Sequence, residues 1–405
     1  MRRPERRGGR RGGRVIAAPL GLALALLAGC AEAPWSGGGQ ITVDTLPGGA
    51  VQVTSPLEGT WGDDEGWWLE EELRIGTSQG DGPELFANIA ALAVDDPGRI
   101  LVLDQQAREL RIFGPDGEHL RTIGRSGSGP GEFTNPVGLA VHPHEGTIWV
   151  VDPGNARYSV FAPEGDLLAT HPRPVGYFAW PWPGGFTHEG ELYDVVAGGL
   201  LHVSAAGEPG DTVWVPEHDT PTVRVADPDG TMRMSLVPPF SPRRHWRFDP
   251  TGHLWSGVSD GFHFTGQTLG GDTVRIVRRD HEPVAVTRAE ADSLREQSEE
   301  LIARNAGPNA QVDGDLRAPP NKPAFETFLV DDEGGLWVEP SRAMDDPVRQ
   351  LHVFDPAGAY LGPVEADPGL RLVNVRPVFR DRALYAVVTD ELDVPHVVRY
   401  RIHSP

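Results

Sequence analysis

Short hydrophobic runs alternate along the chain with turns that contain glycine, proline and aspartate. Residues 100–104 (ILVLD) and 148–152 (IWVVD) are runs of this kind, and a further run follows each of them, at 109–113 and 157–161. Apolar runs of about four to six residues between such turns are typical of β-strands. The pattern therefore predicts an all-β protein built from many short strands.

The strand pattern repeats along the chain. Leu101 and Trp149 are 48 residues apart, and so are Phe113 and Phe161. A third copy, with LWV followed by HVFDPAG, lies within residues 336–358. Repeats of roughly 40–50 residues that hold four short strands indicate the blades of a β-propeller.

A bulky residue in the second strand of each repeat provides a count of the blades. The markers are Leu101, Trp149, Tyr193, Trp255, Trp337 and Tyr385. Six markers predict a six-bladed β-propeller. Their successive spacings are 48, 44, 62, 82 and 48 residues, so the long spacings require an insertion.

Residues 287–307 supply a short helical insertion. Thr287 and Glu290 form a capping-box pattern, and the Gly307–Pro308 pair stops the helix. One face of this helix holds Leu294, Leu301 and Ile302. The helix accounts for most of the longest spacing.

An open ring of blades would leave strand edges unpaired. Residues 67–75 precede the first blade and residues 395–402 end the chain, and both read as strands. We expect the early segment to form the outer strand of the blade that the C-terminal strands build.

The repeat resembles the NHL-type six-bladed β-propeller, and in particular its bacterial lipoprotein versions. The resemblance rests on the Gly turn, strand, Asp, then apolar-x-Val-Phe-x-Pro-x-Gly pattern, and it covers about residues 67–402. It is strong in blades one, two and five and thin in the others.

NHL repeats commonly place an arginine four residues before the phenylalanine, where it pairs with the strand aspartate. Arg157 matches in blade two, whereas Glu109 and Gln350 stand at the equivalent places in blades one and five. The resemblance therefore implies the Asp–Arg pair in blade two only. We expect Asp104, Asp152 and Arg157 to have structural roles.

The N-terminus has the features of an export signal. Arginines crowd residues 2–14, and an apolar run of 13 residues follows at 15–27. This run is shorter than the ~20 residues of a bilayer span, so residues 1–29 read as a signal peptide. Residues 30–60 read as a flexible tether, and residues 61–405 as the propeller.

Cys30, the single cysteine of the chain, follows Leu27-Ala28-Gly29. This arrangement resembles the bacterial lipoprotein signal, which implies cleavage before Cys30 and acylation of its thiol. Ala31 in place of aspartate at the next position implies sorting to the outer membrane. We therefore expect a cell-envelope protein that is bound to the membrane through its lipid alone.

The composition supports a globular β-rich fold, and the net charge excludes one class of partner. The chain has 50 Gly, 38 Pro and 11 Trp in 405 residues, which disfavours a helical bundle and supplies a large core. Without residues 1–29, 29 basic residues face 57 acidic ones, a net charge of −28. So acidic a surface repels nucleic-acid phosphate, so no nucleic-acid partner is expected.

Zinc catalysis is disfavoured by the placement of the histidines. A zinc lyase needs about three His on one metal, and only His245 falls near the layer where the innermost strands begin. His142 and His144 form the one close pair, and they read as a solvated turn at the opposite mouth.

A metal-dependent hydrolase or lyase of the lactonase/NHL-lyase type is the alternative function. Glu326 and Asn374 could supply oxygen ligands beside His245, although Arg244 in the same layer would oppose a cation. No metal or other cofactor is expected otherwise.

An aromatic and arginine-rich patch is the predicted ligand-binding site. It lies at the mouth where the innermost strands begin, and an arginine cluster stands out in so acidic a chain. Its residues are Trp180, Trp182, Arg243, Arg244, His245 and Trp246, with Glu326 and Asn374 at the rim. The competing interpretation is that the Trp wedge between blades and the Arg pair with acids. We expect a monomer that binds a peptide, a carbohydrate or a partner protein.

Overall fold

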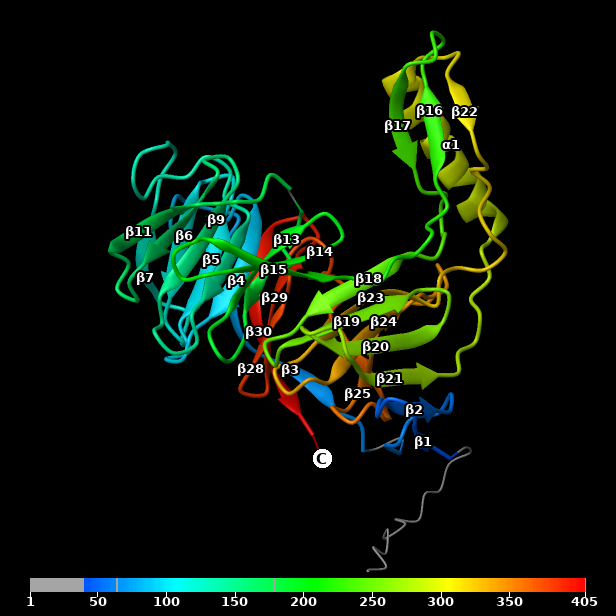
Figure 1. The fold of residues 1–405 in the computed structure, drawn as a ribbon, viewed down its shortest axis with the longest axis horizontal. Helices are drawn as coiled ribbons and strands as arrows, with labels where there is room; N and C mark the ends of the chain where they lie inside the picture. The colour runs from blue at the N-terminus through cyan, green and yellow to red at the C-terminus, as the bar shows by residue number, and fades with distance from the viewer. Residues whose placement is uncertain (1–39, 63–64, 178, 405) are drawn as a thin grey trace, which may run out of the picture. The chain divides into compact units, whose positions relative to one another are not determined.

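The structure is a computed structural model that describes residues 40–62, 65–177 and 179–404. Within these residues the chain forms thirty strands, β1 to β30, and a single helix, α1. Figure 1 shows the strands gathered into separate sheets, with the helix beside a small sheet of its own. The predicted all-β class with one helix is confirmed.

Six sheets follow one another along the chain, and each begins with its innermost strand. Sheet one holds β4 (Ile89–Val94), β5 (Ile100–Asp104), β6 (Glu109–Phe113) and β7 (His119–Ile123). Sheet two holds β8 (Gly138–Val141), β9 (Ile148–Asp152), β10 (Arg157–Phe161) and β11 (Leu167–Pro172). Sheet three holds β12 (Gly185–Phe186), β13 (Leu192–Val196), β14 (Gly199–Val203) and β15 (Pro209–Trp214).

The other three sheets follow the same antiparallel plan with additions. Sheet four holds β18 (Arg244–Phe248), β19 (His253–Val258), β20 (Phe262–Thr268), β21 (Thr273–Arg279), β2 (Val51–Ser55) and β1 (Thr42–Thr45). Sheet five holds β23 (Phe325–Val330), β24 (Leu336–Pro340), β25 (Gln350–Phe354) and β26 (Tyr360–Glu365). Sheet six holds β27 (Leu370–Arg371), β28 (Val378–Arg380), β29 (Ala383–Thr389), β30 (Pro395–His403) and β3 (Trp68–Ile75).

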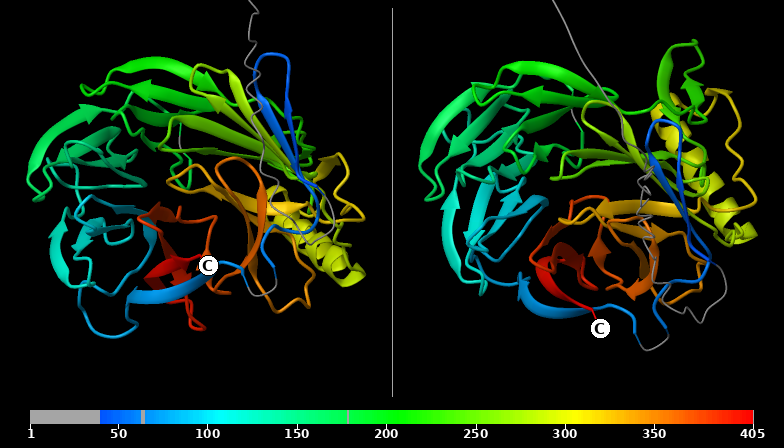
Figure 2. Two further views of the ribbon diagram at one scale, coloured as in Figure 1. Left: turned by 90° about the horizontal axis from the view of Figure 1, so that it is seen from below. Right: turned by 60° about the horizontal axis from the view of Figure 1, so that its bottom comes forward.

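Buried clusters join each sheet to the next. Leu101 and Leu139 share one cluster between sheets one and two, and Phe264 and Phe328 share another between sheets four and five. Sheet six packs on sheet one through a cluster that includes Tyr385. Figure 2 shows the six sheets arranged around a common centre, a propeller-like arrangement. All six bulky markers lie on the second strand of their sheets, as predicted.

The expected pairing of the two chain ends is confirmed. Strand β3 pairs antiparallel with β30, so that Leu69 faces Ile402 and Ile75 faces Val397. Glu72 on β3 accepts hydrogen bonds from Arg399 at 3.0 Å and from Arg401 at 3.0 Å. The N-terminal strand thus covers the edge that β30 would otherwise expose.

Part of the segment expected to be a flexible tether, residues 30–60, is folded. Strands β1 and β2 form a hairpin, and β2 runs parallel to β21 as an extra strand of sheet four. Ala50, Val53 and Ser55 are buried there, and the Ser55 hydroxyl accepts a hydrogen bond from the Tyr360 N–H at 3.0 Å. Alternating Val and Thr in residues 42–55 give this segment strand character, which the Gly-rich residues before it obscured.

The insertion has two parts where the sequence indicated one. The helix α1 (Arg288–Ala306) forms with the predicted Thr287 capping box, confirming that part of the expectation. A hairpin of β16 (Val223–Ala226) and β17 (Met232–Leu236) also stands outside the six sheets and pairs with β22 (Gln311–Asp313). Ile302 of the helix packs against Val225 of the hairpin. The strands of the hairpin have the same alternating pattern as blade strands, so the sequence does not distinguish the two.

The strand aspartates have structural roles, but Asp152 is not paired with Arg157 as the resemblance implied. Asp152 accepts hydrogen bonds from the N–H groups of Thr134 and Asn135, while Arg157 donates to backbone carbonyls, including Gly129 at 2.6 Å. In sheet one Arg111 approaches Asp104 to 3.8 Å instead. An arginine at this place is long enough to reach the interblade loop, and in sheet two it does so.

The signal peptide and Cys30 lie outside the described residues. In the part of the chain that the structure does describe, no helix combines the length and hydrophobicity that crossing a bilayer requires.

Candidate functional site

A cavity of about 620 Å³ opens at the centre of the six sheets. Residues from all six sheets line it, from the innermost strands and from the turns that lead to the second strands. We call it the central cavity and its turn-lined opening the turn mouth. This volume lies within the range of small-molecule sites. The predicted site was placed at the other end of the strands, which we call the entry mouth.

Small and apolar side chains form much of the wall of the central cavity. Ala93 on β4, Val141 on β8, Phe186 on β12 and Val378 on β28 all line it. The small residues on β4 leave room at the centre, because an alanine methyl fills little of the space between neighbouring strands. The wall is suited to the apolar body of a ligand.

Arg376 spans the inner part of the cavity. It precedes β28 in sheet six, and its guanidinium donates to the carbonyl oxygens of Pro183, at 3.2 Å, and of Phe248. It therefore connects sheet six with sheets three and four. Among the described residues no carboxylate lies within ion-pair distance of it. Burial lowers the pKa of Arg376, and the nearby Asp249 opposes that shift.

A second deep arginine, Arg247 on β18, lies close to the first. It donates to the Thr327 hydroxyl at 2.6 Å and to the Trp246 carbonyl at 2.8 Å. Burial, together with repulsion from Arg376, lowers its pKa to about 10, so Arg247 is cationic at neutral pH. Two cations in the centre of an acidic chain attract negative charge to this region.

Carboxylates gather at the turn mouth. Asp332 is half-buried, and its Oδ2 accepts a hydrogen bond from the Asp381 N–H at 3.2 Å. Burial raises the pKa of Asp332, and the neighbouring Asp331 and Asp381 charges act in the same direction. The neighbouring Asp96 differs, because it forms an ion pair with Arg380.

The three tryptophans of the predicted patch come together, but as an apolar cluster. Trp182 is buried among residues of sheets two and three, and Trp180 and Trp246 pack against the same cluster half-buried. The Trp182 indole N–H donates to Asp194 at 2.6 Å, so its polar group is satisfied inside the protein. The competing interpretation, that the Trp wedge between blades, describes Trp182.

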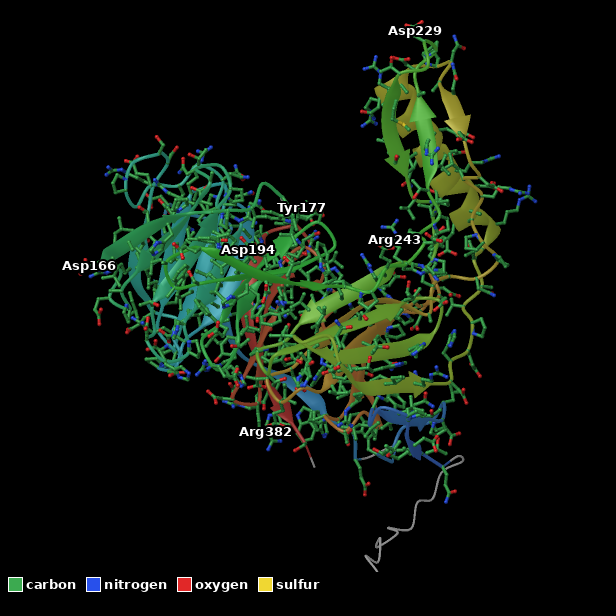
Figure 3. All side chains as sticks on the ribbon, in the orientation of Figure 1. Asp166, Tyr177, Asp194, Asp229, Arg243 and Arg382 are labelled. Carbon is green, nitrogen blue, oxygen red and sulfur yellow. The ribbon has the colours of Figure 1, made fainter. Side chains whose placement is uncertain are left out.

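The arginines of the predicted patch lie elsewhere. Arg243 is exposed at the start of β18, and Figure 3 shows it well apart from Asp194, the partner of Trp182. Arg244 points to sheet three, where it donates to the carbonyl oxygens of Val215, at 3.4 Å, and of Pro216.

His245 faces sheet five instead. Its ring lies 5.2 Å from that of Phe325, and burial, with the charges of Arg247 and Arg243, lowers its pKa to about 4. Consecutive residues of a strand alternate in direction, so the basic run cannot face one ligand.

Within the described residues, neither rim residue forms a hydrogen bond or an ion pair with a residue of the patch. The Glu326 carboxylate accepts a hydrogen bond from the Ser341 hydroxyl at 2.5 Å, and Asn374 is exposed. In the same part of the chain, no group of three or more His, Cys, Asp and Glu side chains has a metal-binding arrangement. A metal site formed by His245, Glu326 and Asn374 stays a prediction from the sequence.

The sequence analysis missed Arg376 and Asp332. Both flank the innermost strands of their sheets, but nothing in their local sequence distinguishes them from surface charges. The available signal was position: Asn374, which was predicted at the rim, stands two residues before Arg376.

Comparison with known proteins supports the fold. The model of a 6-bladed β-propeller family matches residues 78–164, which contain sheet one and much of sheet two. The sequence matches none of the curated proteins.

Two solved structures resemble the chain over most of its length. A DUF4221 family member from Bacteroides vulgatus has a TM-score of 0.51 at 10% identity, covering 85% of this chain and 100% of its own. A protein from Bacteroides fragilis described as exported has a TM-score of 0.51 at 12% identity, covering 87% of this chain and 100% of its own. Virginiamycin B lyase from Staphylococcus aureus is more distant, with a TM-score of 0.43 at 10% identity over 82% and 99% of the two chains. The first two likenesses support the propeller fold and nothing beyond it.

Proposed function

We propose that the chain is an exported, lipid-anchored six-bladed β-propeller that binds a small ligand in its central cavity. The observation that carries the proposal is a cavity of about 620 Å³ to which all six sheets contribute residues. A few polar groups converging in a largely apolar pocket are the usual form of a small-molecule site.

The anchoring part of the proposal rests on the sequence. Cys30 follows a signal-like segment, and the resemblance to bacterial lipoproteins implies an acylated, outer-membrane protein. The exported description of the Bacteroides fragilis relative supports an envelope location. Such a protein would hold its ligand at the membrane surface without transforming it.

A cavity-filling variant tests the binding site. Val141 lines the cavity and is half-exposed, so Val141→Trp adds bulk to the cavity with little disturbance of the core. Val43 on β1 is exposed, and Val43→Trp is the matched control. The readout is the melting temperature of each protein across a library of small metabolites and dipeptides.

Ligands should raise the melting temperature of the wild type and of Val43→Trp by a few degrees when present far above their Kd. Val141→Trp should lose these shifts. If it keeps them while Arg244→Ala abolishes them, the ligand binds at the entry mouth and the central cavity is not the site.

A further inference from the structure

Arg376 and Asp332 line the same cavity with opposite charges, and within the described residues neither forms an ion pair. Arg376 precedes the innermost strand β28 of sheet six, and Asp332 lies in the turn between β23 and β24 of sheet five. Most other charges that line it are paired: Asp95 with Arg99, and Asp96 with Arg380. An unpaired charge in a low-dielectric site costs free energy, and a ligand of opposite charge offsets that cost.

The guanidinium of Arg376 is suited to a carboxylate. It has five N–H donors, and its hydrogen bonds in the structure, to two backbone carbonyls, leave others available. Arg247 nearby adds positive charge, because its own partners are a hydroxyl and a carbonyl. A planar carboxylate can accept two parallel hydrogen bonds from such a group.

The turn mouth favours a positive group on the same ligand. Six acidic residues line the cavity and its opening, against three arginines: Asp95, Asp96, Glu145, Asp331, Asp332 and Asp381 against Arg99, Arg376 and Arg380. A ligand that carried only negative charge would be repelled by this excess. A ligand that carried only positive charge would leave Arg376 without an anion.

We propose that the central cavity binds a short peptide with free ends, its carboxylate on Arg376, its ammonium group at Asp332, and its side chains against the apolar wall. This inference rests on the proposed function and adds the chemical class of the ligand. A single anion or a single cation matches only one end of the cavity.

The experiment compares one set of dipeptides in four forms that differ only in whether each end is free or blocked. A library of dipeptides built from Ala, Val, Leu and Phe is prepared with free ends, N-acetylated, C-amidated, and blocked at both ends. Each library is incubated with the purified protein, and retained peptides are counted by mass spectrometry after gel filtration. We expect the free library to be retained at least tenfold more than either singly blocked one.

Charge variants connect each end of the peptide to its residue. Arg376→Gln should abolish the preference for a free carboxylate and leave the preference for a free amine, while Arg376→Lys should retain both. Asp332→Asn should abolish the preference for a free amine and leave the preference for a free carboxylate. The melting temperature of each variant without ligand separates loss of binding from loss of folding, and Arg376→Lys keeps the test valid if Arg376→Gln is unstable.

The outcomes distinguish this inference from the proposed function. If uncharged or doubly blocked compounds bind and Val141→Trp removes their binding, the cavity is a ligand site but the peptide class is wrong. If end preferences exist but survive both charge variants, the assignment to Arg376 and Asp332 is wrong. If no retained compound responds to Val141→Trp, the proposed function fails as well.

Discussion

Arg173, Arg279 and Arg376 have three different environments; the first two are buried and the third is half-buried. Arg173 pairs with Asp194, at 2.6 Å, and Arg279 packs over the Tyr360 ring at 4.0 Å. Arg376 donates to two backbone carbonyls and, as far as the structure describes the chain, forms no ion pair with a carboxylate. Arg173 is satisfied by its ion pair, and Arg279 is held by its ring contact and by hydrogen bonds to His352 and Leu57, although its Nε–H has no partner. Both have structural roles, whereas Arg376 retains N–H donors for a ligand.

His352 should make folding stability depend on pH. Arg279 donates to its Nδ1 at 2.8 Å, which requires that nitrogen to be unprotonated. Burial, and then the Arg279 charge, lower the pKa of His352 to about 3. As pH falls from about 6.5, the unfolded chain takes up a proton that the folded chain does not, so stability is lost, by at most about 1.4 kcal/mol per pH unit.

Urea unfolding between pH 7 and pH 4 measures this effect. The stability of the wild type should fall more steeply with decreasing pH than that of His352→Gln. His188→Gln, which alters an exposed side chain, should follow the wild type. Parallel curves for wild type and His352→Gln would contradict the assignment.

At the scale of elements, the junction of sheets two and three depends on one buried carboxylate. Asp194 on β13 accepts hydrogen bonds from Tyr158 of β10, from Arg173 and from Trp182. The shortest donor–acceptor distance to each of the three residues is 2.6 Å. Burial, followed by the Asp194 charge, raises the pKa of Tyr158, so its hydroxyl remains a donor. The innermost strand of sheet three, β12, has only two residues, and this network adds a connection between sheets two and three.

Asp194→Asn should therefore weaken the fold strongly. The change removes the charge while keeping the shape, and it leaves Arg173 buried without its anion, a loss of roughly 3–5 kcal/mol. Chemical denaturation checks the value. Asp166→Asn, at an exposed turn, should change stability by less than about 0.5 kcal/mol. A loss no greater than that control would show that the network is not a major contributor.

At the scale of the whole molecule, distant parts of the sequence meet at two places. Strand β3 joins sheet six, and the hairpin of β1 and β2 joins sheet four. Both pairings join the first strands of the described residues to sheets formed by much later parts of the chain. A lipid on Cys30, which lies outside the described residues, remains a prediction from the sequence.

Cys30→Ser tests the anchor. The variant should still be exported but should move from the membrane pellet to the soluble fraction, and it should no longer incorporate radiolabelled palmitate, because the acylated thiol is absent. Ala33→Ser, three residues away, should remain with the membranes. Recovery of Cys30→Ser in the membrane fraction would contradict anchoring through this residue.

Much of the fold was predictable from the sequence because blade strands are local. Turn, apolar run and bulky marker recur within each repeat, so the second strand of every sheet could be assigned from Leu101 to Tyr385. The hairpin β16–β17 could not be separated from a blade, because its partner β22 follows about 75 residues later and no local pattern encodes that pairing. The surroundings of Trp182 could not be predicted for a related reason, since only the packed structure shows that its indole N–H donates to Asp194.

The sequence by itself determined the strand class, the number of repeats, the closing pairing of β3 with β30 and the capped helix, because these follow from hydrophobic period and turn chemistry. Only the tertiary structure decided where a cavity opens and which charges line it. Arg376 and Asp332 belong to different sheets, and they meet one cavity because six sheets pack around a common centre. Whether an arginine is paired depends on carboxylates that are remote in the chain, and that information is present only once the sheets are packed.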